Sequence, residues 1–299
     1  MAVSSSMRLR AEGAVARRQW LSRASRYLFL GATLCGLAVL ALLMFITLRE
    51  GLERLDWDFL VNYPSRFPEQ AGIRPALLGT IWVVGVTMIL AVPIAVGTAI
   101  WIEEFAPRNG FLSFVKLNLS NLAGVPSIIY GILGLAVFVR FYSLGPVILA
   151  GSLTLALMII PMTVIASQEA IRQVPPSQRD GALALGATRW QAVRHNVLPS
   201  AMPGIMTGII LALSRAAGET AAIIMIGGFT FLQFSPSFLT PVQSLTDAFT
   251  ILPIQIYGWT IDPREAFRQN AAAAIIVLMV GVMVLNIFAA VIRERFRPS

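Results

Sequence analysis

The chain has 299 residues, of which 57% are hydrophobic and only 13% are charged, and its mean hydropathy is +0.75. A soluble domain carries about 25% charged residues, so this composition excludes an ordinary soluble protein and indicates a polytopic membrane protein. The net charge of +8 would suggest a nucleic-acid partner in a soluble chain. Most basic residues here flank apolar runs, so we interpret them as signals of membrane orientation and expect no nucleic acid.

Six apolar runs predict an all-α fold with six transmembrane helices, because each run is long enough to cross a hydrocarbon core of about 30 Å. Residues 1–27 are polar and basic and predict an N-terminal tail, and residues 28–299 are predicted to form the transmembrane domain. The first run exceeds a signal-peptide core of roughly 7–15 residues and is interpreted as a retained span. The expected spans cover residues 28–48, 75–102, 122–139, 146–167, 200–232 and 271–292.

The fourth and fifth spans are joined by a polar, basic segment, residues 168–199, which we call the elbow. The motifs Ser177-x-x-Asp180 and Thr188-x-x-Gln191 each predict a capping box at the start of a short helix. Gly186 lies between them, at a position that suits the positive φ found just after a helix. Pro199 is expected to stop the second helix. The elbow is therefore predicted to be two short helices with a bend at Gly186, outside the membrane.

Six spans place both termini and the elbow on one side of the membrane. The segments on that side hold 15 Lys and Arg residues, whereas those on the opposite side hold 7. The positive-inside rule therefore predicts that both termini and the elbow are cytoplasmic.

The fifth span carries two charged residues, Arg215 and Glu219, in its middle. A charge at this depth costs about 2.5–3.5 kcal/mol on insertion scales unless it faces protein or water. Their i,i+4 spacing places both side chains on one helix face, where they can neutralise each other. Two interpretations stay open, a structural ion pair and a polar point on a solute path.

The same span repeats a small residue at every fourth position, which forms a ridge that lets another helix approach closely. This ridge lies about 100° around the helix from Arg215. Its members are Ser200, Gly204, Gly208, Ala212 and Ala216.

The residue sets of common enzymes are missing from the sequence. The only lysine, Lys116, is followed by Leu117, so the chain has no Walker A loop. One cysteine, Cys35, and one histidine, His195, allow neither an intrachain disulfide nor a Cys/His metal site. No Gly-x-Ser-x-Gly motif occurs, and no aspartate lies inside an expected span. We therefore expect no catalytic residues and no metal site, and a membrane enzyme is the weakest hypothesis.

Residues of the elbow resemble the EAA motif of ABC importer permeases. Asp180-Gly181-Ala182, then Gly186, then Asn196-x-Leu198-Pro199 follow the spacing of that motif. Asp180, Gly181 and Asn196 depart from its usual Glu, Ala and aliphatic residue. The resemblance implies that the elbow couples the chain to an ATPase through Asp180, Ala182, Gly186, Ala187, Trp190, Leu198 and Pro199.

Three further stretches are similar to the PstA-type permease of bacterial phosphate importers. They are NLAGVPSIIYG at residues 121–131, RAAGET at 215–220 and LPIQIY at 252–257. The RAAGET signature is shared with the sister PstC-type subunit. This resemblance implies a type I ABC importer permease with the MetI-like fold, and a substrate path that includes Arg215, Glu219 and Thr220.

The partners that the resemblance implies are a PstC-type second permease, two PstB-type ATPase subunits and a PstS-type phosphate-binding protein, periplasmic or surface-anchored. The complex would import inorganic phosphate across the bacterial cytoplasmic (inner) membrane. ATP and Mg would bind to the ATPase, and this chain would hold no cofactor. A permease for another oxyanion, such as sulfate or molybdate, and a stand-alone secondary transporter or channel remain alternatives.

Overall fold

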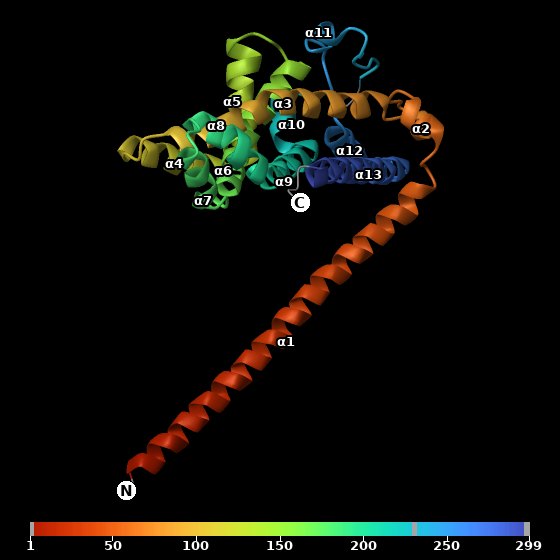
Figure 1. Cartoon of the computed structure of the whole chain (residues 1–299). Coiled ribbons are helices and arrows are strands. Elements are labelled where there is room, and N and C mark those ends of the chain that lie inside the picture. Colours follow the sequence, from red (N-terminus) through yellow and green to blue (C-terminus); the bar gives the residue numbers. More distant parts are fainter. Residues whose placement is uncertain (1–2, 229–231, 296–299) are drawn as a thin grey trace. The chain divides into compact units, whose positions relative to one another are not determined.

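The computed structural model describes residues 3–228 and 232–295, and this part of the chain is helical apart from its loops. Its only extended pairing is an isolated bridge between Val147 and Ala248. The chain divides into two compact units, Met1–Glu50 and Gly51–Ser299. The elements (Figure 1) are α1 (Val3–Leu52), α2 (Trp57–Val61), η1 (Pro68–Gln70), α3 (Arg74–Ile100), η2 (Trp101–Phe105), α4 (Gly110–Ala123), α5 (Ser127–Gly134), η3 (Leu135–Phe141), α6 (Ile148–Arg172), α7 (Pro176–Ala184), α8 (Arg189–Ala192), η4 (Val193–Val197), α9 (Leu198–Ala217), α10 (Ala221–Ile226), α11 (Pro241–Ser244), α12 (Leu252–Thr260) and α13 (Ala266–Arg295).

Five of these helical segments are long and apolar enough to cross a membrane, and a sixth crossing is possible through one bent pair of helices. The expected all-helical, membrane-spanning architecture is thus confirmed. The five segments are Arg18–Leu52, Arg74–Phe105, Ile148–Arg172, Arg189–Ala217 and Ala266–Glu294.

The first unit consists of most of helix α1, which begins at Val3 and so includes the polar segment that the sequence predicts as a tail. The apolar run of residues 28–48 lies inside this helix. Residues 1 and 2 lie outside the described part of the chain.

The bent pair takes the place of the single span that the sequence predicts over residues 122–139. Helix α4 ends at Ala123, helix α5 begins at Ser127, and the two axes differ by 99°. Pro126 precedes α5 and disfavours a helical conformation at Val125, which explains why the helix breaks here. The chain then continues from α5 into η3, a π-helical segment that ends at Phe141.

The fifth expected span is also interrupted. Helix α9 ends at Ala217 and the separate helix α10 begins at Ala221, so a continuous helix over residues 200–232 is wrong. Gly227 follows α10 with a φ of +94°, a conformation that glycine adopts without strain, so it suits the end of that helix. Residues 229–231 of that expected span lie outside the described residues.

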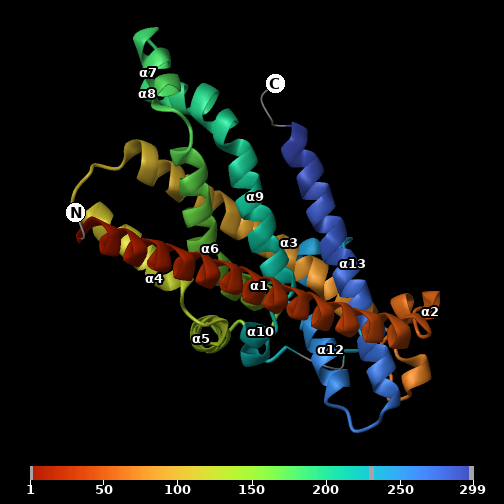
Figure 2. The ribbon, with the colours of Figure 1, turned by 90° about the horizontal axis from the view of Figure 1, so that it is seen from below.

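Helix α6 is the centre of the packing in the second unit, because it contacts both α3 and α9 (Figure 2). The predicted ridge of small residues on α9 faces α6. A methyl group added at Gly204 would meet Ala170 Cβ at 2.7 Å, and one added at Gly208 would meet Ala166 Cβ at 2.6 Å. The ridge therefore acts as the sequence predicts, by letting two helices approach closely.

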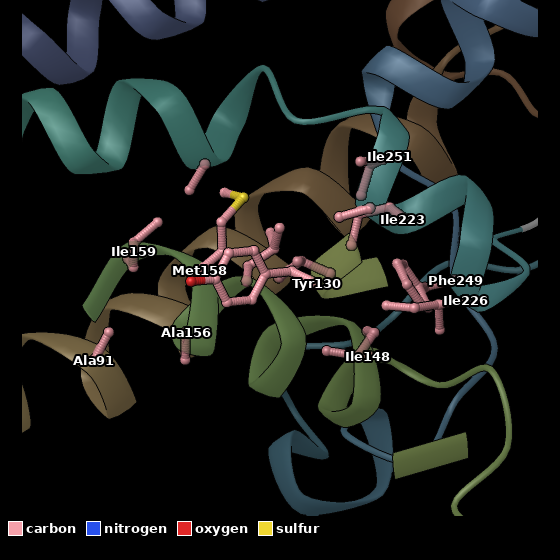
Figure 3. Packing of buried hydrophobic residues seen from close by; sticks show 14 of the residues in the cluster. Ala91, Tyr130, Ile148, Ala156, Met158, Ile159, Ile223, Ile226, Phe249 and Ile251 are labelled. Carbon is pink, nitrogen blue, oxygen red and sulfur yellow. The ribbon is translucent and has the colours of Figure 1, made fainter. Parts of the chain in front are cut away.

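Three large buried clusters hold the second unit together. One joins α3, α5, α6, α9, α10 and α12 around Tyr130, Met158, Ile223 and Phe249 (Figure 3). A second joins α3, α6 and α9 near the elbow, and a third packs α2, α3, α12 and α13 around Phe59 and Trp259. Helix α12, which lies between the fifth and sixth expected spans, thus belongs to the core.

Candidate functional site

The elbow forms a bent pair of helices, as predicted, but its first helix starts differently. Helix α7 begins at Pro176 after Pro175, and no side chain caps its N-terminus. The capping box predicted for Ser177 and Asp180 is therefore wrong, because Ser177 is already inside the helix that Pro176 starts. The second box is confirmed: Gln191 N–H donates to Thr188 Oγ1, and Thr188 N–H donates to Gln191 Oε1.

The bend between the two helices lies at Gly186, whose φ is +85°. No atom lies within 4 Å of a Cβ placed at Gly186. Glycine is required here by the backbone conformation and not by crowding, since an L-residue in this region costs about 1–2 kcal/mol. The predicted role of Gly186 in the bend is confirmed.

Pro199 does not stop the second helix. The chain runs as one helical segment from Arg189 to Ala217, with the π-helical η4 placed directly before the turn that contains Pro199. A proline lacks the N–H that an α-helix needs, and a local π-helical turn lets the helix continue around such a defect. The second helix of the elbow is therefore rigidly continuous with the span α9.

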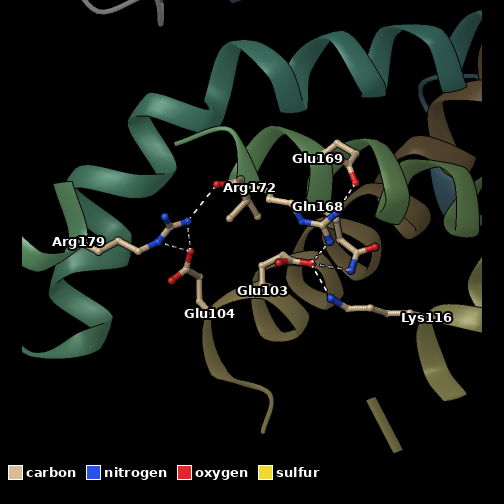
Figure 4. A network of polar contacts seen from close by, with 8 residues as sticks. Glu103, Glu104, Lys116, Gln168, Glu169, Arg172 and Arg179 are labelled. Atoms are coloured by element: carbon tan, nitrogen blue, oxygen red, sulfur yellow. Dashed lines mark hydrogen bonds and ion pairs between the residues drawn. The ribbon is translucent and has the colours of Figure 1, made fainter. Parts of the chain in front are cut away.

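Two adjacent carboxylates at the end of η2 anchor the elbow to the second span (Figure 4). Arg179 of α7 donates to Glu104 Oε1 from Nε at 2.9 Å and from Nη2 at 2.6 Å. Arg179 also donates to the carbonyl oxygens of Val174 and Ile171, at 2.9 and 3.0 Å. The guanidinium thus ties α7 to the ends of both α3–η2 and α6.

The neighbouring carboxylate, Glu103, collects three donors from two other elements. Its Oε1 accepts from Lys116 Nζ at 3.0 Å, Arg172 Nη2 at 2.9 Å and Gln168 Nε2 at 3.2 Å. Sequence reasoning missed both carboxylates. An acidic pair at a span end, on the side that the distribution of arginines predicts to be cytoplasmic, was the signal that could have found them.

The tip of the elbow exposes apolar side chains away from the rest of the fold. Leu185 is 91% exposed, and Leu183 and Trp190 are exposed as well. On the inner side of the elbow, the ring centroids of Trp190 and Phe105 are 6.2 Å apart. The guanidinium carbon of Arg189 lies 5.5 Å from the centroid of the same Phe105 ring. Exposed apolar residues outside the spans are typical of a surface that binds another protein.

The predicted coupling residues divide between this tip and its base. Asp180, Gly186, Trp190 and Pro199 are exposed, whereas Ala182 and Ala187 are half-buried. Leu198 packs against the buried cluster of α3, α6 and α9.

The second candidate site lies where α9 gives way to α10, and it differs from the prediction. Glu219 follows the end of α9, and its Oε1 accepts a hydrogen bond from Ala222 N–H at 3.2 Å. Arg215 is exposed on the last turn of α9, and among the described residues no ion pair joins it to Glu219. Of the two interpretations left open by the sequence, the structural ion pair is thus not seen, because α9 ends at Ala217 and the i,i+4 geometry needs a helix that continues to Glu219.

Thr220 precedes α10, and its hydroxyl donates to Gly218 O at 3.4 Å. Helix α10 packs closely on α5, since a methyl group at Gly131 would meet Ala222 O at 2.6 Å. Helix α10 thus holds the break between α9 and α10 next to α5 of the bent pair. The three predicted path residues, Arg215, Glu219 and Thr220, lie in the sequence at this junction of interrupted helices. Within the described residues no group of His, Cys, Asp and Glu could hold a metal ion.

Comparison with solved structures shows which known fold the chain shares. The chain superposes on a subunit of a bacterial alginate ABC transporter, crystallised with a periplasmic protein bound to an alginate pentasaccharide, with a TM-score of 0.66, 18% identity, and coverage of 95% of this chain and 97% of that one. An inward-facing MetNI methionine ABC transporter gives a TM-score of 0.57 at 16% identity, over 75% of this chain and 95% of that one. The fold is that of a MetI-like ABC importer permease.

Residues 91–298 match the family described as binding-protein-dependent transport system inner membrane component, and the chain belongs to this family. It is 31% identical to the probable ABC transporter permease protein YqgI of Bacillus subtilis, over 84% of this chain and 88% of that protein. It is 30% identical to the phosphate transport system permease protein PstA 1 of Mycobacterium tuberculosis H37Rv, over 93% and 89% of the two chains. It is 34% identical to the phosphate transport system permease protein PstC of Haemophilus influenzae, over 71% and 78%. The protein is an ABC importer permease, a multi-pass membrane subunit that works with an ATPase and a binding protein.

Proposed function

We propose that this chain and a second, PstC-type permease form the path for inorganic phosphate import, driven by PstB-type ATPase subunits and supplied by a PstS-type binding protein. The observation that carries the proposal is Arg215, an exposed cation on a membrane span with no ion pair among the described residues. The similarity to PstA-named and PstC-named relatives supports phosphate as the substrate.

The position of Arg215 explains how the path would attract an anion. A charge within a span is stable only where it faces protein or water, so the surface around Arg215 is covered by a partner subunit or lines an aqueous cavity. Glu219 accepts a hydrogen bond from the N–H of Ala222. Since no ion pair joins Glu219 to Arg215 among the described residues, the Arg215 guanidinium is available to an oxyanion. Arginine offers phosphate two parallel N–H donors, and Thr220 adds a hydroxyl nearby in the sequence.

The elbow would receive the ATPase on the cytoplasmic face of a bacterial inner membrane. Its exposed Leu183, Leu185 and Trp190 provide an apolar docking surface, and Gly186 fixes the angle between its helices. Because α7 is tied to η2 through Glu104 and α8 continues into α9, a push on the elbow moves two spans as rigid bodies.

The test is ATP-driven phosphate uptake into vesicles that contain the complete complex, with Arg215→Ala and Arg215→Lys variants. We expect Arg215→Ala to lower uptake by at least tenfold, and Arg215→Lys to retain part of it, because lysine keeps the charge but loses the two-donor geometry. Arg18→Ala, an exposed arginine on α1, is the control and should leave uptake unchanged. Full uptake in both Arg215 variants would remove Arg215 from the path.

Competition by other anions tests the choice of substrate. Two solved structures of this fold are of transporters for alginate and methionine, so the fold alone does not select phosphate. Excess unlabelled phosphate should abolish labelled phosphate uptake, whereas sulfate and molybdate should leave it intact. Stronger inhibition by sulfate or molybdate would assign the complex to that oxyanion.

A further inference from the structure

A basic cavity of about 910 Å³ lies beside the elbow, outside the substrate path proposed above. Its wall is made by η2, the loop after it, the start of α4, the end of α6 and the start of α8. The charged side chains that line it are Glu103, Arg108, Lys116, Arg172 and Arg189.

Cations outnumber carboxylates in this cavity. Lys116 and Arg172 share the single carboxylate Glu103, at 3.0 and 2.9 Å. Arg172 has a second partner in Glu169 at 2.8 Å, outside the cavity wall. Arg108 and Arg189 have no ion pair among the described residues. The cavity therefore carries excess positive charge and suits a bound anion.

The cavity lies at the ends of three candidate membrane spans. These spans end at Phe105 and Arg172 and begin at Arg189, and all three residues line the cavity. The three helices have 32, 25 and 29 residues, more than the roughly 20 that cross a hydrocarbon core, so their ends reach the headgroup region.

The rim of the cavity continues into apolar surface. Gly110 and Ser113 of α4 line the cavity, and the next residue after each, Phe111 and Phe114, is an exposed phenylalanine. Exposed aromatic side chains at a span end suit the boundary between headgroups and acyl chains. A basic pocket bordered by apolar surface matches the two parts of a phospholipid, and basic pockets between spans are known binding sites for anionic headgroups.

We propose that this cavity binds the phosphate-bearing headgroup of an anionic phospholipid, next to the joint between the elbow and the spans. Arg108, Lys116 and Arg189 contact the headgroup, and the acyl chains follow the exposed face of α4. Because Arg189 begins the second helix of the elbow, the bound lipid braces the elbow against α4.

The experiment is a titration of the purified, delipidated full-length chain in detergent with phosphatidylglycerol or phosphatidylcholine, read by native mass spectrometry. The wild type should retain phosphatidylglycerol in preference to phosphatidylcholine. Arg108→Gln should weaken retention of phosphatidylglycerol about fivefold, the effect expected of one basic residue at a membrane surface. Arg108→Lys should restore it. Arg194→Gln makes the same change of charge at an exposed arginine of η4 outside the cavity, and should leave retention unchanged.

Four outcomes would overturn the proposal. Equal retention of the two lipids would show that charge does not select the ligand, and unchanged retention in Arg108→Gln would place the lipid elsewhere. Displacement of phosphatidylglycerol by millimolar inorganic phosphate would make the cavity a site for the free anion. Loss of the lipid when the ATPase subunit is added would show that the partner protein occupies the cavity. A matching melting temperature of Arg108→Gln and wild type would exclude misfolding as the cause of any loss.

Discussion

Glu104 is a carboxylate at the end of a membrane span, and its side chain is only 7% exposed. A buried charge is tolerated when it is paired and hydrogen-bonded, and Arg179 donates to Glu104 Oε1 from two of its nitrogens, Nε and Nη2, within 2.9 Å. The arginine is itself held by the carbonyl oxygens of Val174 and Ile171, at the C-terminal end of α6. The pair therefore serves as the joint between the elbow and the second span.

Replacing Arg179 by methionine should destabilise the protein by about 3 kcal/mol, because it leaves the Glu104 carboxylate buried without its partner. The melting temperature of the detergent-purified chain measures this loss. Arg194→Met, which removes an exposed arginine with no ion pair among the described residues, is the matched control. Equal melting temperatures for the two variants would contradict the assignment of Arg179 as an anchor.

At the scale of the element, the elbow depends on one backbone conformation. Gly186 has a positive φ in open space, whereas Gly181, five residues earlier and also in open space, lies inside helix α7. The two glycines are thus equally uncrowded but differ in backbone geometry. Substitutions at these positions separate a conformational requirement from a steric one.

Gly186→Val should distort the bend, since a β-branched residue at positive φ costs at least about 1–2 kcal/mol, and should uncouple ATP hydrolysis from uptake in the complete complex. Gly181→Ala should preserve coupling and stabilise α7 by up to about 1 kcal/mol, because alanine is the better helix former. The measurement is the ratio of substrate imported to ATP hydrolysed in vesicles. Normal coupling in Gly186→Val would show that the bend is dispensable.

The interrupted helices are the other feature at this scale. The 99° bend between α4 and α5 and the break between α9 and α10 place short helices against each other in the middle of the fold. In membrane proteins such breaks are tolerated only where protein or a water-filled cavity covers the backbone. The break beside Arg215 is for this reason a suitable lining for a solute path.

At the scale of the whole molecule, the exposed surfaces indicate a subunit and not a self-contained transporter. The elbow presents Leu185 and Trp190 to its surroundings, and α9 presents Arg215. An apolar patch outside the membrane and an unpaired charge within a span both need a covering partner. The family to which the chain belongs provides such partners.

The purified chain alone, reconstituted in liposomes, should therefore show no flux of labelled phosphate above that of empty liposomes. The complete complex with ATP should show uptake, and the complex without ATP should not. Flux through the isolated chain would favour a secondary transporter or channel, in which the elbow is only a connector.

The sequence by itself determined the helical class, the presence of several spanning segments and the position of the elbow. These follow from local patterns, because hydropathy over a span, the Thr188 capping box and the Gly186 turn each depend on neighbouring residues only. The cytoplasmic location of both termini, inferred from the distribution of arginines, stays a prediction. So do the roles of the coupling residues and of Arg215.

Only the tertiary structure decided where the spans break and which charges pair. Arg179 and Glu104 are 75 residues apart, and no local pattern joins them. The pairing of Arg215 with Glu219 fails for the opposite reason: their i,i+4 spacing is local, but Gly218 ends the helix against α10 and α5. Helix continuity through Pro199 likewise depends on the π-helical turn before it. Local sequence determines which segments can be helical, whereas packing between distant segments determines where each helix bends, ends and finds its ionic partners.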